Sequence, residues 1–351
     1  MSKLKLLWAL GQVFLPEGIV GAIRGGRLPV VDGRRIDPKA QAVTELVALL
    51  RAPDAPPSLE QSRVQIAQMA AKFERPCPSE VRKADIALPG ADGLRPARVY
   101  VPRGTDPEPA QPTLLFLHGG GWVQGGLDTH DGMCGHLSHL AGIRVISLDY
   151  RLAPEHPFPA APDDVLACYR GLLDGAGGLN VRAGQLAVGG DSAGGNLTAC
   201  LMHDLGAGGL PMPAAQVLIY PGTDGRLNTR SMHDLRDQPV LPADRIAWYL
   251  DLYLPEGQDR GDPRVSPLLS DHLAGQPPAF IIAGGHDPLW DDAQSHARAL
   301  QEAGVPVELL NYPGQVHAFV SLTRVVPQGN DALRKTASWL QAALTRGSDA
   351  R

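Results

Sequence analysis

The stretch from Leu186 to Asn196, Leu-Ala-Val-Gly-Gly-Asp-Ser-Ala-Gly-Gly-Asn, is the most informative part of the sequence about the fold. Its apolar start predicts a buried strand, and a helix is expected to follow over Asn196–Leu205. Gly190 and Gly194 stand two places either side of Ser192, where β-carbons would collide with backbone in a sharp strand-to-helix turn. The pattern predicts that Ser192 has strained backbone angles and that the turn places its hydroxyl above the sheet. An ordinary glycine-rich turn is the alternative, since the chain has 40 glycines.

Composition limits the classes of protein to which the chain can belong. It has 351 residues, 44% of them hydrophobic and 20% charged, which predicts a globular protein with a substantial core. The net charge of −5, without a Lys/Arg run, argues against nucleic acid or an anionic membrane surface as the main partner. Four widely spaced cysteines form no CxxC pair, so we expect neither a zinc site nor a disulfide framework, and we predict a cytoplasmic protein.

The N-terminus has features of a secretory signal. Lys3 and Lys5 precede the apolar run Leu6–Leu10, but Pro16 soon stops the pattern and no convincing cleavage site follows. The run is also too short to span a bilayer, so no integral membrane span is expected. We predict a helix whose apolar side docks on the body of the protein, with peripheral membrane contact as the alternative.

The chain as a whole alternates between strands and helices after a helical N-terminal segment. The expected strands are Asp85–Leu88, Ala97–Val101, Thr113–Leu117, Arg144–Leu148, Leu186–Val188, Gln216–Tyr220, Ala279–Ala283 and Val307–Asn311. The expected helices between them are Asp128–Ala141, Ala160–Leu173, Asn196–Leu205, Asp292–Ala303 and Asp331–Leu344. This order predicts an eight-stranded, mostly parallel sheet with helices on both faces. A short turn at Gly90–Gly93 predicts that its first two strands are antiparallel.

One long excursion breaks the alternation after Tyr220-Pro221. It contains a strong helical pattern over Leu241–Leu254, and we interpret it as part of a lid together with the N-terminal helices. The predicted organisation is an N-terminal cap segment (1–81), a first part of the core (82–223), a cap insertion (224–268) and a second part of the core (269–351).

A second glycine-rich motif, His118-Gly119-Gly120-Gly121-Trp122, directly follows the strand Thr113–Leu117. Consecutive glycines let the backbone approach a ligand and offer bare N–H groups to a developing oxyanion. The N–H of Ala193 would complete this set of donors, the oxyanion hole. A phosphate-binding loop is the alternative, but no Lys-Ser/Thr follows the glycines. For His118 we predict a structural role in holding the loop.

A serine nucleophile needs a base, and the base needs an orienting carboxylate. In this kind of sheet both should follow the serine, each just after a strand, in the order Ser, Asp, His. Asp287 follows the strand Ala279–Ala283, and His317 follows Val307–Asn311. These two residues are therefore the candidate partners of Ser192.

Other residues compete for the same roles. His286 is a rival base, but it is adjacent to Asp287, and neighbouring residues cannot readily pair as base and orienter. Asp287 itself could simply cap the helix that follows it. Two further carboxylates lie deeper in that helix and should point away from the site: Asp291 and Asp292.

These motifs resemble those of the hormone-sensitive-lipase-like (bacterial family IV) esterases of the α/β-hydrolase fold. The resemblance rests on His118–Trp122, Gly190–Gly195, Asp287–Leu289 and Asp149–Ala160, with further similar runs, and covers the chain from about Asp37. It implies Ser192 as nucleophile, His317 as base and Asp287 as orienter. It also implies that five motif residues support this site: His118, Gly119, Gly190, Asp191 and Gly194. The oxyanion donors that it implies are the backbone N–H groups of Gly120, Gly121 and Ala193.

The sequence thus predicts a serine carboxylesterase for short- to medium-chain esters that needs no metal or cofactor. Its expected partner is a small-molecule ester, and a homodimer is left open. Two alternatives remain: the same machinery acting on an amide, formamide, lactone or carbamate, and a non-catalytic binder on the same fold. Pocket residues that set the preference are expected on the cap, at Trp248, Tyr249 and Phe14. About thirty N-terminal residues and His286 lie outside the usual pattern of the family.

Overall fold

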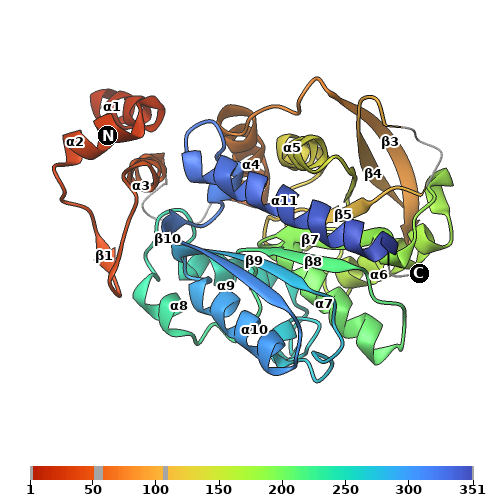
Figure 1. Cartoon of the computed structure of the whole chain (residues 1–351). Coiled ribbons are helices and arrows are strands. Elements are labelled where there is room, and N and C mark those ends of the chain that lie inside the picture. Colours follow the sequence, from red (N-terminus) through yellow and green to blue (C-terminus); the bar gives the residue numbers. More distant parts are fainter. Residues whose placement is uncertain (1–2, 51–57, 106–109, 350–351) are drawn as a thin grey trace.

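The centre of the molecule is one eight-stranded sheet. The structure, a computed structural model, describes residues 3–50, 58–105 and 110–349. The strand order is β10-β9-β8-β7-β5-β6-β4-β3 (Figure 1). The strands are β3 (Val81–Gly90), β4 (Gly93–Pro102), β5 (Thr113–Leu117), β6 (Arg144–Leu148), β7 (Leu186–Asp191), β8 (Ala215–Ile219), β9 (Ala279–His286) and β10 (Val307–Val316). The eight predicted strands are confirmed, and those at β5 and β6 have the predicted bounds.

The direction of the strands also follows the prediction, with one addition. β3 and β4 are antiparallel, as the short turn indicated, but β4 is antiparallel to β6 as well. All other neighbours in this sheet are parallel. Every residue of β5, β6, β7 and β8 is buried, which is why these strands are apolar runs without alternation. Because these four strands are parallel, their carboxyl ends meet at one edge of the sheet.

Helices cover both faces of the sheet. Side chains of α5 and α11 pack with Leu114 and Phe116 on one face, while α6 and α7 pack with Leu115 and Leu117 on the other, where α10 also lies (Figure 1). The helices are α5 (Asp131–Ala141), α6 (Ala160–Leu173), α7 (Ala193–Ala207), α10 (Trp290–Glu302) and α11 (Pro327–Asp349). Short 3-10 turns are η1 (Leu127–His130), η2 (Ala176–Gly178), η3 (Ala183–Gln185), η4 (Pro267–Leu269) and η5 (Phe319–Ser321). α7 begins directly after Ser192, earlier than the helical pattern indicated.

The N-terminal segment is helical, as predicted, except for one small hairpin. It contains α1 (Lys3–Phe14), α2 (Glu17–Arg24), α3 (Pro38–Leu50) and α4 (Leu59–Phe73), with β1 (Val30–Val31) paired to β2 (Arg34–Arg35). Asp37 accepts the N–H groups of Lys39 and Ala40 at the start of α3. Ser58 and Gln61, whose residue types and spacing are typical of a capping box, form one at the start of α4. The prolines of Pro53–Pro57 predict a break between the last two of these helices, but this stretch lies outside the described residues.

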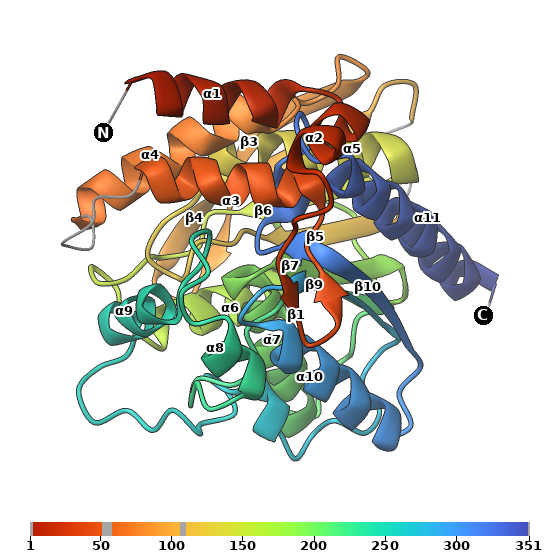
Figure 2. The same ribbon diagram turned by 90° about the vertical axis from the view of Figure 1, so that its left-hand side faces the viewer.

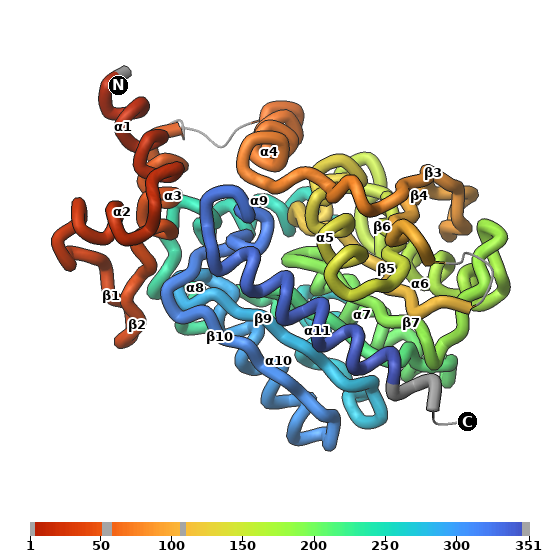
Figure 3. Tube along the Cα trace, turned by 45° about the horizontal axis from the view of Figure 1, so that its top comes forward, coloured from red at the N-terminus to blue at the C-terminus, as the bar shows by residue number. Residues whose placement is uncertain are grey.

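The excursion after β8 contains two helices, α8 (Arg230–Asp234) and α9 (Ala243–Tyr253). α9 agrees with the helix predicted over Leu241–Leu254. Figure 2 shows α1, α3 and α4 stacked over one end of the molecule, with α8 and α9 below them, and Figure 3 shows α4 above α5. In the described part of the chain, no helix has the length and apolar character needed to cross a membrane.

Candidate active site

Ser192 lies in the turn between β7 and α7, with φ 54° and ψ −117°. These angles are strained for a residue with a β-carbon, as the sequence predicted. A β-carbon on Gly190 or on Gly194 would overlap the carbonyl oxygen of Leu117 on the neighbouring strand. The two glycines are therefore required by the close packing of this turn against β5.

The two predicted partners of Ser192 lie at the same edge of the sheet. His317 follows β10, and its Nε2 is 3.0 Å from Ser192 Oγ. Its Nδ1 is 2.6 Å from Oδ2 of Asp287, which follows β9 and is fully buried. Asp287 Oδ1 accepts the N–H of Leu289 at 2.9 Å, which fixes the carboxylate in place. The three side chains form one continuous hydrogen-bonded chain.

The glycine loop lies beside this chain, and His118 holds it as predicted. His118 Nδ1 is 2.9 Å from Gly119 O, and the ring stacks on Tyr150, whose hydroxyl donates to His118 O at 2.7 Å. Burial and the nearby His130 lower the pKa of His118 to about 4. The ring is therefore neutral, and its Nδ1–H donates to the carbonyl of Gly119.

A cavity of about 1200 Å³ opens above Ser192. Residues of both glycine-rich motifs line it next to His317: Gly120, Gly121, Ser192 and Ala193. Apolar side chains of α1, α3, α4 and α9 form its far wall: Leu6, Leu10, Val43, Leu46, Val47, Met69, Ile246 and Tyr249. Tyr249 thus lines the pocket as expected, but Trp248 and Phe14 do not. Phe14 is exposed and stacks on Phe73, while Trp248 packs beside Tyr249.

Comparison with known proteins agrees with this geometry. A family model for the alpha/beta hydrolase fold matches residues 114–321. The chain is 37% identical to a carboxylic ester hydrolase, LipN, of Mycobacterium tuberculosis, over 95% of this chain and 90% of that protein. It is 39% identical to an ethyl acetate hydrolase of Pseudomonas putida, over 74% of this chain and 83% of that protein.

A solved structure extends the comparison to three dimensions. An ester hydrolase from the metagenome of Lake Arreo, complexed with a bipyridine phosphonate derivative, superimposes with a TM-score of 0.83. The two chains are 36% identical, and the match covers 88% of this chain and 98% of that one. The chain belongs to the hormone-sensitive-lipase-like esterases of the α/β-hydrolase superfamily.

The residues that competed for the catalytic roles in this esterase are occupied elsewhere. His286 Nε2 is 2.9 Å from the carbonyl oxygen of Arg34, in the β1–β2 hairpin. Asp291 accepts the N–H of Ser231 at the start of α8. Asp292 is fully buried and accepts the N–H groups of Thr223 and Asp224, so it holds the start of the excursion after β8.

Sequence reasoning missed a buried acid–base cluster beneath the glycine loop of the esterase. Asp191 Oδ1 accepts the N–H of Gly119 at 2.8 Å and lies 3.1 Å from His130 Nε2. Burial opposes charge on both side chains, but their mutual attraction outweighs it, lowering the pKa of Asp191 and raising the pKa of His130. Burial raises the pKa of the adjacent Glu74 to about 7, although His130 opposes this shift.

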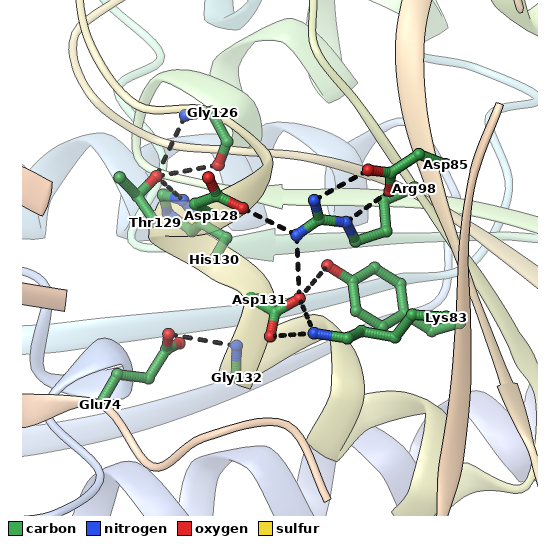
Figure 4. Close-up of polar contacts among 11 residues, drawn as sticks. Glu74, Lys83, Asp85, Arg98, Gly126, Asp128, Thr129, His130, Asp131 and Gly132 are labelled. Atoms are coloured by element: carbon green, nitrogen blue, oxygen red, sulfur yellow. Dashed lines mark hydrogen bonds and ion pairs between the residues drawn. The ribbon is translucent and has the colours of Figure 1, made fainter. Parts of the chain in front are cut away.

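Backbone contacts tie the cluster to its surroundings. Thr129 Oγ1 donates to Gly126 O and lies 2.8 Å from His130 Nδ1, so this ring nitrogen donates to Thr129 (Figure 4). The other ring nitrogen, Nε2, donates to Asp191. Glu74 accepts the N–H of Gly132 at the first turn of α5. The end of α4 and the start of α5 therefore meet directly below the glycine loop. The signal that the sequence offered was Asp191, an acid beside Ser192 to which the family resemblance gave a supporting role.

Proposed function

We propose that this esterase cleaves short- to medium-chain carboxylic esters through an acyl-enzyme on Ser192. The observation that carries the proposal is the continuous contact from Ser192 Oγ through His317 to Asp287 at the base of a largely apolar cavity. A serine hydroxyl becomes an effective nucleophile when an oriented imidazole can take its proton. The contacts among the three side chains support these roles.

The proposed reaction has two halves. Ser192 Oγ attacks the ester carbonyl carbon while His317 Nε2 takes the hydroxyl proton, and Asp287 stabilises the imidazolium. Backbone N–H groups of the glycine loop and of α7 hold the oxyanion: those of Gly120, Gly121 and Ala193. The alcohol leaves with the proton from His317. Water, activated by His317, then attacks the acyl carbon and releases the carboxylic acid and the free serine.

The cavity wall supports esters with an apolar acyl chain of limited length. We assign this wall to a cap made of the N-terminal segment (1–81) and the excursion 224–268. The Pseudomonas putida relative is named an ethyl acetate hydrolase, which supports small acyl groups. All four cysteines are free, which supports a cytoplasmic location with a small-molecule ester as the partner.

The test is hydrolysis of a series of p-nitrophenyl esters with acyl chains of two to sixteen carbons. We expect the highest kcat/KM at short to medium chains and a loss of roughly 10⁶-fold in kcat for Ser192→Ala. Matched anilides should react far more slowly than the esters. Turnover retained by Ser192→Ala would contradict the assignment of the nucleophile, and faster anilide hydrolysis would identify an amidase.

A further inference from the structure

α1 is apolar on two opposite faces. Its inner face buries Ala9 and Val13 and places Leu6 and Leu10 in the wall of the cavity. Its outer face exposes large side chains to solvent: Leu4 (76% exposed), Leu7 (64%), Trp8 (58%) and Phe14 (52%). A surface helix of a globular protein normally has a polar outer face. The outer face of α1 therefore has the composition of a surface that contacts something.

The next helix, α2, also exposes large apolar side chains, Ile19 and Ile23. Within the described residues, twelve large hydrophobic side chains are exposed, and half of them belong to α1 and α2. These two helices form an outer layer at one end of the molecule (Figures 1 and 2). Apolar side chains gathered in this way mark an interaction surface, whereas scattered ones do not. We call the exposed side chains of α1 and α2 the outer apolar face.

Charge indicates what this face contacts. The first 35 residues contain six Lys or Arg and only two Asp or Glu, a net charge of +4. The rest of the chain therefore carries −9, against a total of −5. α1 has no acidic residue, and Lys5 on it is exposed, as are Arg27 and Arg35 near the hairpin. The net charge of the whole chain, which argued against an anionic membrane as the main partner, does not show that its two parts have net charges of opposite sign.

We propose that the outer apolar face is a docking surface for an anionic lipid bilayer. Leucine and tryptophan side chains on a helix that lies in the interface insert among the acyl chains and headgroups, while nearby cations attract anionic lipids. The acidic remainder of the molecule is repelled by the same lipids, so only this end faces the membrane. A second copy of the chain fits less well, because a symmetric contact would place two positive patches against each other.

Docking would also bring the cavity close to the lipid. Leu6 and Leu10 line the cavity from the inner face of the helix whose outer face carries Leu7 and Trp8. A helix with its side chains is about 10 Å thick. The cavity wall would then lie one helix thickness from the bilayer. Its consequence for substrate access rests on the proposed function, but the docking itself does not.

The test measures binding of the full chain to sucrose-loaded vesicles of phosphatidylglycerol and phosphatidylcholine. The Ser192→Ala form is used so that lipid hydrolysis cannot interfere, and binding can then be scored even if the proposed function fails. We expect the protein to bind these mixed vesicles at least tenfold more strongly than vesicles of pure phosphatidylcholine. Binding to the mixed vesicles should fall at high salt. The double variant Leu7→Ser/Trp8→Ser should bind at least tenfold more weakly than the parent.

Leu94→Ser is the matched control, because Leu94 is 64% exposed but lies on β4 and is not part of the outer apolar face. It should bind vesicles like the parent. Each substitution made in the active chain should leave hydrolysis of a dissolved short ester unchanged, which shows that the fold is intact. Equal binding by parent and double variant, or no binding by the parent, would overturn the proposal. So would a dimer in sedimentation that the double substitution abolishes.

Discussion

The carboxyl edge of the sheet and the N-terminal layer above it, α1 to α3, are held by different forces. At the edge, Ser192 has strained backbone angles and hydrogen bonds of 3.0 and 2.6 Å link it through His317 to Asp287. In the layer, α1 packs on α3 through apolar side chains. Arg24 of α2 pairs with Glu45 of α3, and the Lys39 ammonium of α3 donates to the carbonyl of Leu15 just after α1. We therefore propose that the edge determines whether an ester reacts and that the layer determines which ester enters.

Among variants that keep Ser192, the largest effect should come from Asp287→Asn. An amide at this position can accept the Nδ1–H only in one orientation and no longer stabilises the imidazolium, so kcat should fall about 10⁴-fold. Asp291→Asn is the control, because Asp291 bonds Ser231 and not His317. Steady-state kinetics on a short p-nitrophenyl ester measures both. A loss of kcat below tenfold in Asp287→Asn would contradict the role of Asp287 in stabilising the imidazolium of His317.

Gly120→Ala should have the next largest effect. Gly120 has φ 128°, and a β-carbon there would overlap the carbonyl oxygen of Gln124, so the loop must shift. Displacing one oxyanion donor costs roughly 10²–10³-fold in kcat. Gly104→Ala is matched, because Gly104 also has a positive φ but has open space around it. If both variants keep full activity, the glycine loop has no part in catalysis.

Asp292→Asn tests the electrostatics of the edge through stability. Burial, outweighing two backbone N–H donors, raises the pKa of Asp292 from 3.8 to about 8. Because the folded-state pKa lies above the unfolded one, this group contributes stability below about pH 4 that is lost as the pH rises to about 8. The neutral isostere has no such loss. The free energy of unfolding of Asp292→Asn relative to the parent should therefore rise by on the order of 1 kcal/mol per pH unit over this range.

Denaturant titrations at several pH values measure this difference. Oδ2 of Asp292 accepts both backbone N–H groups, so a correctly oriented asparagine can keep these contacts. A difference between variant and parent that does not change with pH would contradict the neutral state of Asp292.

The smallest effect should come from the layer. Val47→Phe narrows the cavity from α3, so kcat/KM for an octanoyl ester should fall by roughly five- to tenfold while that for an acetyl ester changes little. Leu49→Phe is the control on the same helix, because Leu49 is half-buried but is not in the cavity wall. Equal losses for both esters would remove the distinction between edge and layer.

The sequence allowed prediction of the edge much better than of the layer. Central parallel strands are continuous apolar runs between turn residues, so their positions could be derived, and the order Ser, Asp, His placed Asp287 and His317 at neighbouring strand ends. The cluster of Glu74, His130 and Asp191 could not be derived, because contacts between segments so far apart leave no local pattern. For the same reason Phe14 was wrongly assigned to the pocket. The β1–β2 hairpin was missed for another reason: Asp32-Gly33 is a local turn signal, but each strand is only two residues long and shows no alternating pattern.

The most direct test of the central claim is labelling with a p-nitrophenyl phosphonate diester. Ser192 Oγ should attack phosphorus, form one P–O bond and expel one p-nitrophenolate per chain, which absorbance can count. Mass spectrometry of the digested protein should then find the phosphonyl group on the peptide that contains Ser192, and Ser192→Ala should give neither signal. Inactivation with the label on another residue, or no label on an active enzyme, would contradict the assignment of Ser192 as the nucleophile.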